Sequence, residues 1–446
     1  MTIRILLCER ETTQSMALLE RLNNLLWGFP LLVLLLGTHI YFTIKLHFPQ
    51  RNLIYALKLS LGKTDDGDVN ISPFSALATT LAATLGTGNI IGVSTAVALG
   101  GPGAIFWCWI TGILGMATAY SECYLSVLFR SRNKDGSYVG GPMYVLKNGL
   151  HNKYLGGLYA FCTLLAAFGV GCTTQANSVT QAAAASFHLS PHPVGIALAF
   201  LTGAVIIGGV RSIANLCERT VPAISFIYMF GCILLLFLYR GVFLSACLLI
   251  VKDAFSLGSV AGGVTGATLQ HAVRYGVARG LFTNEAGIGT SAIAAAASHT
   301  TQPRIQAYVS MTAVFWDTVV MCLITGLVIV SNMLYDPASI AGVAETGLTA
   351  AAFGHLPYVG DAFLTISLAA FAVTTLIGWS YFGEKATEYL VGKKGIPLYK
   401  FAYILMIYLG AIIPMRLVWE STDLINALMV LPNVLALYCL RRYIRS

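Results

Sequence analysis

Two polar interruptions of apolar stretches contain the residues that could bind a charged ligand. The first, LGTGNIIG at 85–92, holds three glycines, a threonine and an asparagine. The second, RGLFTNEAGIGTSAIAAAA at 279–297, holds three glycines together with Asn284 and Glu285. A helix that breaks at such a place offers the positive end of a half-helix dipole to an anion and free carbonyl groups to a cation. Both stretches therefore predict a ligand site made from broken helices.

Close helix packing is the alternative for the first stretch, because Gly88 and Gly92 form a G-x-x-x-G pair. Packing explains the second stretch less well, since it does not require Asn284 and Glu285. An acid inside a membrane span is costly and indicates function.

The composition indicates that these stretches lie in a membrane. Of the 446 residues, 57% are hydrophobic and 10% are charged, and the mean hydropathy is +0.74. A soluble domain has about 25% charged residues, so this chain is expected to be an all-α polytopic membrane protein. The ten cysteines form no C-x-x-C pair and mostly lie in apolar runs, which is typical of small buried side chains.

Eleven stretches have the roughly 20 apolar residues that a membrane helix requires. Residues 245–262 are too polar and glycine-rich to span and are expected at the membrane interface. The expected spans are 26–46, 72–98, 101–129, 154–187, 193–209, 213–239, 266–298, 304–332, 360–390, 400–416 and 420–440.

The loops between these spans predict the orientation. Of the 27 Lys and Arg residues, 19 lie in one set of alternate loops and 6 lie on the other side, while Arg274 and Arg279 lie inside a span. Because cytoplasmic loops are enriched in Lys and Arg, the C-terminus is expected in the cytoplasm and, with eleven spans, the N-terminus outside.

The two interruptions lie about half a chain apart. If the first span is an extra helix, they fall in the first and sixth of the ten remaining helices, as in transporters built from inverted repeats. The expected organisation is an N-terminal segment (1–25), an extra helix (26–46), a first repeat (72–239), an interfacial loop (240–265), a second repeat (266–440) and a cytoplasmic tail (441–446).

Several long motifs resemble those of the bacterial alanine/glycine:cation symporters. They are LGTGNIIGVSTAVALGGPGAIFWCWITGILGMATAYSE (85–122), DGSYVGGPMYVL (135–146), QANSV (175–179), GLFTNEAGIGTSAIAAAASHTTQP (280–303) and TTLIGWSYFGEKATEYLVG (374–392). The resemblance runs from about residue 20 to the C-terminus. It implies a LeuT-type fold with two inverted five-helix repeats, and sodium-coupled uptake of alanine and glycine across the bacterial inner membrane.

The substrate that the resemblance implies is a small zwitterion. Thr87, Gly88 and Asn89, at the first predicted break, are assigned to its carboxylate, with a polar packing patch as the alternative. Carbonyl groups freed at 282–285 are assigned to its ammonium group, with Phe282 as a cap and Asn284 among the contacts. Glu285 either contacts the amine or bonds the backbone ends of its own broken helix, and the second reading is favoured.

Two further helices are expected to complete the pocket. Gln175 and Asn177 are two residues apart and cannot share a helix face, so only one of them should point at the site. The resemblance favours Gln175, and Asn177 is expected to join helices. Thr375 and Trp379 are four apart and share a face, where the indole would limit side-chain size unless it packs against lipid.

The sodium site is placed by analogy with LeuT-type folds. Carbonyl groups near Ala82 and Leu85 and the hydroxyls of Thr374 or Thr375 are expected to coordinate the ion.

Two acids within the spans have alternative readings. Asp317 either joins a cation site with Asn89 or pairs with Arg274 or Arg279. Glu122 is interpreted as forming an ion pair at a helix end with Arg130 or Arg132.

Competing classes are weaker. No H-E-x-x-H or G-x-S-x-G motif supports an intramembrane enzyme, and no repeated filter or ring of charges supports a channel. Proton coupling stays open as an alternative to sodium because Glu285 and Asp317 can titrate. The expected partners are a small amino acid, sodium and the lipid bilayer, with no cofactor, nucleic acid or obligate protein partner.

Overall fold

The computed structural model describes residues 29–61, 71–256, 269–413 and 415–445. The expected N-terminal segment (1–25) lies outside this part of the chain, as do the first residues of the spans expected at 26–46 and 266–298. Helices occupy all eleven stretches in which spans are expected.

The first half of the chain contains two broken or distorted spans. The chain breaks between α4 and α5, and a π-helical stretch, η4, joins α8 to α9. The elements are α2 (Phe29–Lys45), η1 (Pro49–Asn52), α3 (Leu53–Ser60), α4 (Pro73–Thr84), η2 (Thr87–Asn89), α5 (Ile91–Gly100), α6 (Gly103–Leu128), β1 (Ser131–Arg132), β2 (Tyr138–Val139), α7 (Pro142–Tyr144), η3 (Val145–Gly149), α8 (Lys153–Phe168), η4 (Gly169–Thr173), α9 (Thr174–Phe187), α10 (Pro191–Ile207) and α11 (Gly209–Leu238).

The second half also contains one broken span and one span with a π-helical stretch. The chain breaks between α13 and α14, and η5 joins α15 to α16. The elements are α12 (Arg240–Ala254), α13 (Leu269–Asn284), α14 (Ser291–Ala296), α15 (Pro303–Val314), η5 (Phe315–Cys322), α16 (Leu323–Tyr335), η6 (Pro337–Ile340), α17 (Leu348–Phe353), α18 (Gly360–Val391), η7 (Lys393–Gly395), α19 (Ile396–Ile412) and α20 (Met415–Cys439).

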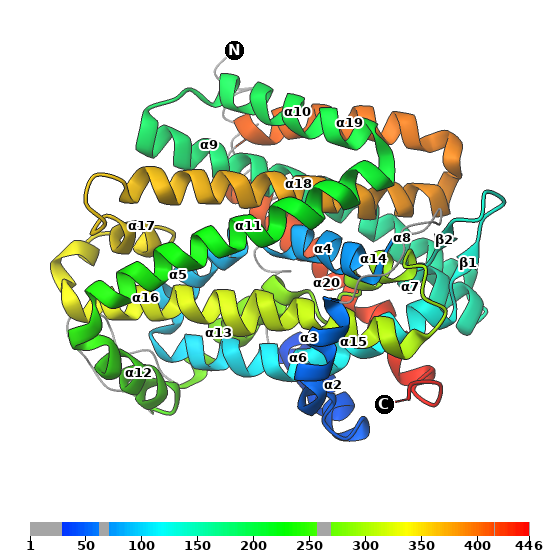
Figure 1. Cartoon of the computed structure of the whole chain (residues 1–446), viewed down its shortest axis with the longest axis horizontal. Coiled ribbons are helices and arrows are strands. Elements are labelled where there is room, and N and C mark those ends of the chain that lie inside the picture. Colours follow the sequence, from blue (N-terminus) through cyan, green and yellow to red (C-terminus); the bar gives the residue numbers. More distant parts are fainter. Residues whose placement is uncertain (1–28, 62–70, 257–268, 414, 446) are drawn as a thin grey trace, which may run out of the picture.

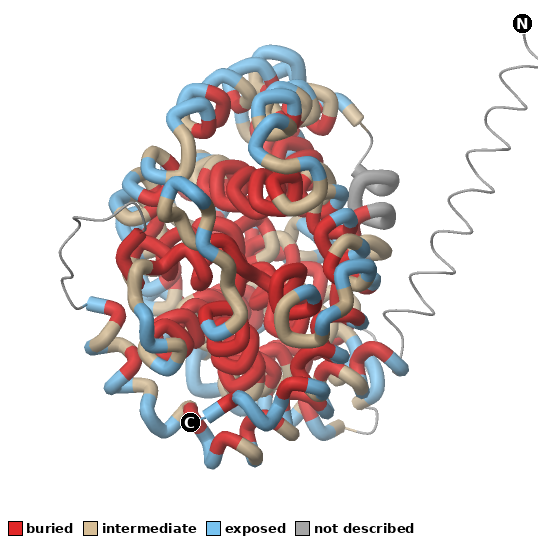
Figure 2. The backbone as a smooth tube through the Cα atoms, turned by 90° about the vertical axis from the view of Figure 1, so that its right-hand side faces the viewer, coloured by how far each residue is buried: buried red, intermediate tan, exposed pale blue. Residues whose placement is uncertain are grey.

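Long helices run side by side through the molecule (Figure 1), with α18 packed against α4, α8, α9 and α11. On the other side of α4, helix α6 packs along α13, α14 and α15. Buried positions fill the middle of the bundle, and exposed positions lie at its margin (Figure 2). The broken helices therefore lie inside the protein, where irregular backbone is tolerated in a membrane.

The outer helices show the apolar surface that a lipid environment requires. Only 28% of the most apolar window of α11 is buried, and the same holds for the 393–412 segment that contains α19. Their exposed side chains include Phe226, Phe230 and Phe401. A helix that is apolar all round and yet exposed is typical of a membrane span.

Fewer helices meet the length and hydropathy of a membrane span than the sequence predicts. Within the described residues, six helices are long and apolar enough to cross a membrane, or eight if each of two bent pairs counts as one span. The count of eleven spans stays a prediction. The segment expected at the interface, 245–262, belongs in part to helix α12, whose last residue is Ala254.

Candidate functional site

The first break lies where the sequence predicts it. Helix α4 ends at Thr84 and α5 begins at Ile91, and the chain bends by 60° between them. Gly86 N–H donates to the Asn89 side chain (3.0 Å) and not to the Ala82 carbonyl that would continue the helix. Ala82 thus lies in the last turn of α4 with its carbonyl released from that helical bond, next to the site.

Close packing does not explain the glycines of the G-x-x-x-G pair. A Cβ atom added to Gly88 would lie no closer than 3.7 Å to Thr283, and one added to Gly92 would lie 3.9 Å from Arg279 Cδ. Both are ordinary contacts. A Cβ atom on Gly86, however, would lie 2.7 Å from Thr375 Oγ1, so the break itself requires the small residue.

Two predicted pocket residues reach this break from other helices. Thr375 of α18 donates from Oγ1 to the Leu85 carbonyl (3.2 Å), and Gln175 of α9 accepts from Thr87 N–H at Oε1 (3.4 Å). The neighbouring Thr374 hydroxyl donates to the Phe371 carbonyl in its own helix. Thr375 Oγ1 also lies 2.9 Å from the Phe371 carbonyl, so both hydroxyls bond within α18, and that of Thr375 reaches the Leu85 carbonyl as well.

Asn177 follows the alternative that the sequence favoured for it. Its amide donates to the carbonyl groups of Gly410 (3.2 Å) and Ile413 (2.6 Å) at the end of α19. Gln175 faces the break and Asn177 joins two helices, so the prediction that only one of them points at the site agrees with the structure.

Asp317 lies with Asn89, which was one of its two expected arrangements. Asn89 donates from Nδ2 to Asp317 Oδ1 (2.8 Å), and Thr318 donates to Oδ2 (2.7 Å). Asp317 is fully buried in the π-helical stretch η5. Asn89, which contacts Asp317, also accepts from the N–H of Gly86, the residue after Leu85. Of the five predicted cation ligands, Asp317 is therefore linked indirectly to Leu85 and Thr375.

The second break is a turn with three left-handed residues. Helix α13 ends at Asn284, and Glu285 (φ 54°), Gly287 (φ 94°) and Gly289 (φ 92°) precede α14. The Asn284 side chain accepts from Ala286 N–H (3.0 Å), and Glu285 Oε2 accepts from the Thr290 hydroxyl across the break. Glu285 therefore bonds across its own broken helix, through the Thr290 hydroxyl and not through the backbone ends that the favoured alternative named.

The two breaks meet in the core. There, η2 contacts α13, η5 and α18. Gly88 of the first break faces Thr283 of α13. The Glu285 carboxyl group lies near Asp317 and near the indole N–H of Trp379. Trp379 is buried, which excludes a lipid-facing position, while Phe282 is half-buried.

Glu122 corrects one interpretation of the sequence. It is buried in α6 and accepts from Gly287 N–H (2.8 Å) and from the Asn433 amide (2.6 Å), so it does not form a helix-end ion pair. Arg130 instead donates to the carbonyl groups of Ala296, Ser298 and Thr300. The sequence signal for the contact between Glu122 and Asn433 was the presence of a polar residue, Asn433, in an apolar span.

Comparison with known proteins decides the family. The family model described as the sodium:alanine symporter family matches residues 12–446. The chain belongs to that family. Its function is therefore sodium-coupled amino-acid symport across a membrane that the chain crosses several times, and it is not an enzyme.

Relatives match over nearly their whole length. The chain is 44% identical over 433 residues to the sodium/alanine symporter AgcS of Methanococcus maripaludis, covering 95% of this chain and 94% of that protein. It is 42% identical over 430 residues to an uncharacterized transporter of Haemophilus influenzae, covering 96% and 94%. It is 35% identical over 425 residues to the probable sodium/glutamine symporter GlnT of Bacillus subtilis, covering 95% and 87%.

Solved structures support the fold. A Na⁺-coupled sialic acid symporter shares it with a TM-score of 0.56 at 13% identity, covering 86% of this chain and 82% of that one. A manganese transporter of Eremococcus coleocola gives a TM-score of 0.53 at 13% identity, covering 84% and 79%. The symporter thus has the LeuT-type fold that its motifs imply.

Two cavities lie at opposite ends of α18 in the symporter. One of about 280 Å³ reaches the first break at Ile90 and Ile91 and includes Asp361 and Leu364 from the start of α18. The other, of about 340 Å³, lies at the end of α18. The breaks between them are buried, so the site has a separate cavity on each side.

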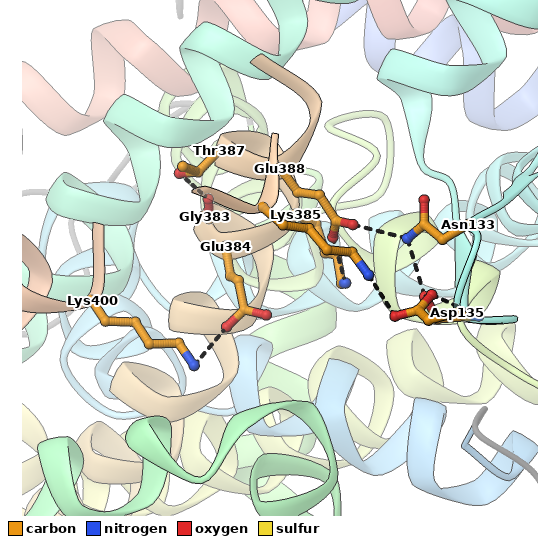
Figure 3. A network of polar contacts seen from close by, with 10 residues as sticks. Asn133, Asp135, Gly383, Glu384, Lys385, Thr387, Glu388 and Lys400 are labelled. Carbon is orange, nitrogen blue, oxygen red and sulfur yellow. Dashed lines mark hydrogen bonds and ion pairs between the residues drawn. The ribbon is translucent and has the colours of Figure 1, made fainter. Parts of the chain in front are cut away.

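A network of charges surrounds the second cavity (Figure 3). Near the end of α18, Lys385 bonds Glu388 (2.8 Å), and Glu384 bonds Lys400 of α19 (3.1 Å). Asn133, in the β1–β2 hairpin, donates to Glu388 (2.9 Å). The hairpin, α18 and α19 are therefore tied together here.

A second link joins the hairpin to η7. Lys393 donates to Asp135 (2.5 Å), and this bond, together with that from Ser137, holds the pKa of the Asp135 carboxyl well below its usual range. The bonds of Arg130 to the chain after α14 lie at the base of the same hairpin. The hairpin thus contacts both α18 and the end of the second broken helix.

Proposed function

We propose that this symporter carries alanine and glycine into a bacterial cell together with sodium. The observation that carries the proposal is the meeting of two broken helices at Gly88 and Thr283, with Gln175 and Thr375 directed at the first break. The printed names of relatives add support, since one is a sodium/alanine symporter. Another is named a probable sodium/glutamine symporter, and glutamine is a larger amino acid than alanine.

The substrate site is proposed at the meeting point of the breaks. N–H groups in the first turn of α5 have no acceptor within their own helix, and together with Thr87, Gly88 and Asn89 they suit a carboxylate. Carbonyl groups at the end of α13 suit the ammonium group, next to Phe282 and Asn284. Gln175, Thr375 and Trp379 complete the wall, and the buried indole limits the substrate to a small side chain.

Sodium is proposed to bind between α4 and α18. The carbonyl groups of Ala82 and Leu85 and the hydroxyl of Thr375 are hard oxygen ligands at one place, and the Leu85–Thr375 bond of 3.2 Å shows how close these two groups lie. Thr374 would join after rotating away from Phe371. Asp317 is proposed to act through Asn89, which fixes the turn that releases these carbonyl groups.

The transport route is proposed to run along α18. The cavity at Ile90 and Ile91 would admit substrate from outside, and the cavity at Glu384 and Glu388 would release it to the cytoplasm. This direction follows from the excess of Lys and Arg on the second side. It agrees with the proposed eleven spans, two inverted repeats of five helices after one extra helix, an external N-terminus and an inner-membrane location.

Uptake of labelled alanine into proteoliposomes tests the proposal. An inward sodium gradient is expected to drive saturable accumulation, and unlabelled glycine is expected to compete. Accumulation that ignores sodium and follows an inward proton gradient would assign the coupling to the buried acids Glu122, Glu285 and Asp317 instead. Absence of uptake with either gradient would contradict both assignments.

A further inference from the structure

The turn in the second break is held by side chains from three helices outside it. Glu122 of α6 accepts from both Gly287 N–H and the Asn433 amide of α20 at one oxygen, Oε1. Asn433 also donates to the Gly287 carbonyl (2.8 Å), and Tyr159 of α8 donates to the Ile288 carbonyl (2.8 Å). Both backbone groups of Gly287 are thus satisfied by side chains and need no ligand.

The surroundings of Glu122 favour a neutral carboxyl group. Its side chain is 2% exposed, and no described Lys, Arg or His forms an ion pair with it. Its other oxygen, Oε2, has no hydrogen-bond partner among the described residues. An ionised carboxylate without a counter-charge is costly in such a place, whereas a neutral carboxyl keeps one oxygen to accept both N–H groups.

The titratable groups around Glu122 supply no compensating positive charge. They are Tyr159 from α8, Cys123 from α6 itself and Glu285 from the break. His39 of α2 contacts α6 one turn earlier, where it bonds Thr118 (2.7 Å).

We propose that Glu122 is a positioning residue of the transport site, and that it acts as a neutral, protonated acid. By fixing Gly287 it fixes Glu285, two residues earlier, and Asn284 before it, so that the end of α13 faces the first break. The effect on transport rests on the proposed function, while the effect on the turn does not.

Two variants distinguish a role of Glu122 as hydrogen-bond acceptor from a role of its negative charge. Glu122→Gln keeps a carbonyl oxygen that can accept from Gly287 and Asn433, whereas Glu122→Leu removes it at similar size. For each, sodium-driven alanine uptake is measured at acidic, neutral and alkaline pH, and hydrogen exchange is followed at residues 285–290. Glu122→Gln is expected to keep the KM for alanine within about twofold, with the pH profile of the wild type, and Glu122→Leu to raise KM about tenfold because buried donors lose their acceptor.

Exchange at Gly287 is expected to accelerate in Glu122→Leu and to stay slow in Glu122→Gln. If Glu122→Leu does not fold, Asn433→Ala replaces it, and exchange at the turn is again expected to rise because one of the three supports is gone. The proposal would be overturned if folded Glu122→Gln lost uptake. It would also be overturned if Glu122→Leu, or Asn433→Ala in its place, kept slow exchange and an unchanged KM. A wild type that does not take up alanine contradicts the proposed function alone, since the exchange comparison needs no substrate.

Discussion

A methyl group added at Gly86 is expected to disable the first break. The new Cβ atom would lie 2.7 Å from Thr375 Oγ1 and 3.3 Å from Gln175 Oε1. Gly86 has φ −139° and ψ −156°, which an alanine can adopt, so the penalty is steric. Thr375 would have to rotate and would lose its bond to the Leu85 carbonyl.

The expected increase in KM follows from the steric clash and from the lost hydrogen bond. Overpacking costs about 1–3 kcal/mol, and a hydrogen bond contributes about 1 kcal/mol. With about 1.4 kcal/mol for each tenfold change, a total of about 2–4 kcal/mol corresponds to an increase of about 30- to 700-fold in the KM for sodium or alanine. The assay is the initial rate of labelled alanine uptake into proteoliposomes as either concentration is varied.

Gly92→Ala is the matched control, because its Cβ atom would meet only Arg279 Cδ at 3.9 Å. Its KM is expected within about twofold of the wild type, since alanine is also the better helix former by about 1 kcal/mol. Removing the clashing hydroxyl in Gly86→Ala/Thr375→Ala should make the double variant less impaired than the sum of the two single changes. A Gly86→Ala protein with the kinetics of Gly92→Ala would refute the steric account of the break.

Three other outcomes are expected. Gln175→Ala should raise the KM for alanine about tenfold, because the buried Thr87 N–H loses its acceptor. Asn177→Ala should chiefly lower the melting temperature, because it removes the hydrogen bonds between α9 and the end of α19. Asp135→Asn or Lys393→Gln should speed thiol labelling of a cysteine placed in the cavity at Glu384 and Glu388. Because the pKa of Asp135 is lowered in the folded protein, the stabilisation from its bond to Lys393 is present above the unfolded pKa of about 3.9 and is lost only as pH falls through the folded value. Wild-type labelling should therefore not change between about pH 5 and 8. Replacing sodium by choline should reduce the thermal stabilisation that alanine provides, and a stabilisation independent of sodium would contradict coupling between the two ligands.

Local sequence signals predicted the two breaks well. Glycine and polar residues inside an apolar stretch disfavour a helix whatever surrounds them. Helix α4 ends at Thr84, directly before the first interruption, and α13 ends at Asn284, inside the second. The same local reasoning separated Gln175 from Asn177, because residues two apart on a helix face different neighbours.

Contacts that depend on tertiary structure were not predictable from spacing. Glu122 and Asn433 are separated by 311 positions, and nothing near Glu122 in the sequence indicates a partner in the last helix. Arg130 and Arg132 were the charges closest to it along the chain, which is why an ion pair was the natural interpretation. The π-helical stretch η5 that turns Asp317 toward Asn89 likewise has no sequence signal of its own.

The position of the charge network on α18 gives a physical reason for coupling the proposed site to the cavity at Glu384 and Glu388. The helix is continuous over 32 residues, about 48 Å at 1.5 Å per residue, and it carries Asp361 in one cavity, Thr375 and Trp379 beside the breaks, and Glu388 in the other cavity. A displacement of α18 that accommodates ligand at Thr375 must also move Glu388 relative to the hairpin, because a continuous helix bends little over this length. Arg130, at the base of that hairpin, bonds the chain after α14. The same displacement would therefore also move the chain at the second break. In the proposed function, ligand at the two breaks and closure of the cavity at Glu384 and Glu388 therefore act on one rigid element, which is the arrangement that alternating access requires.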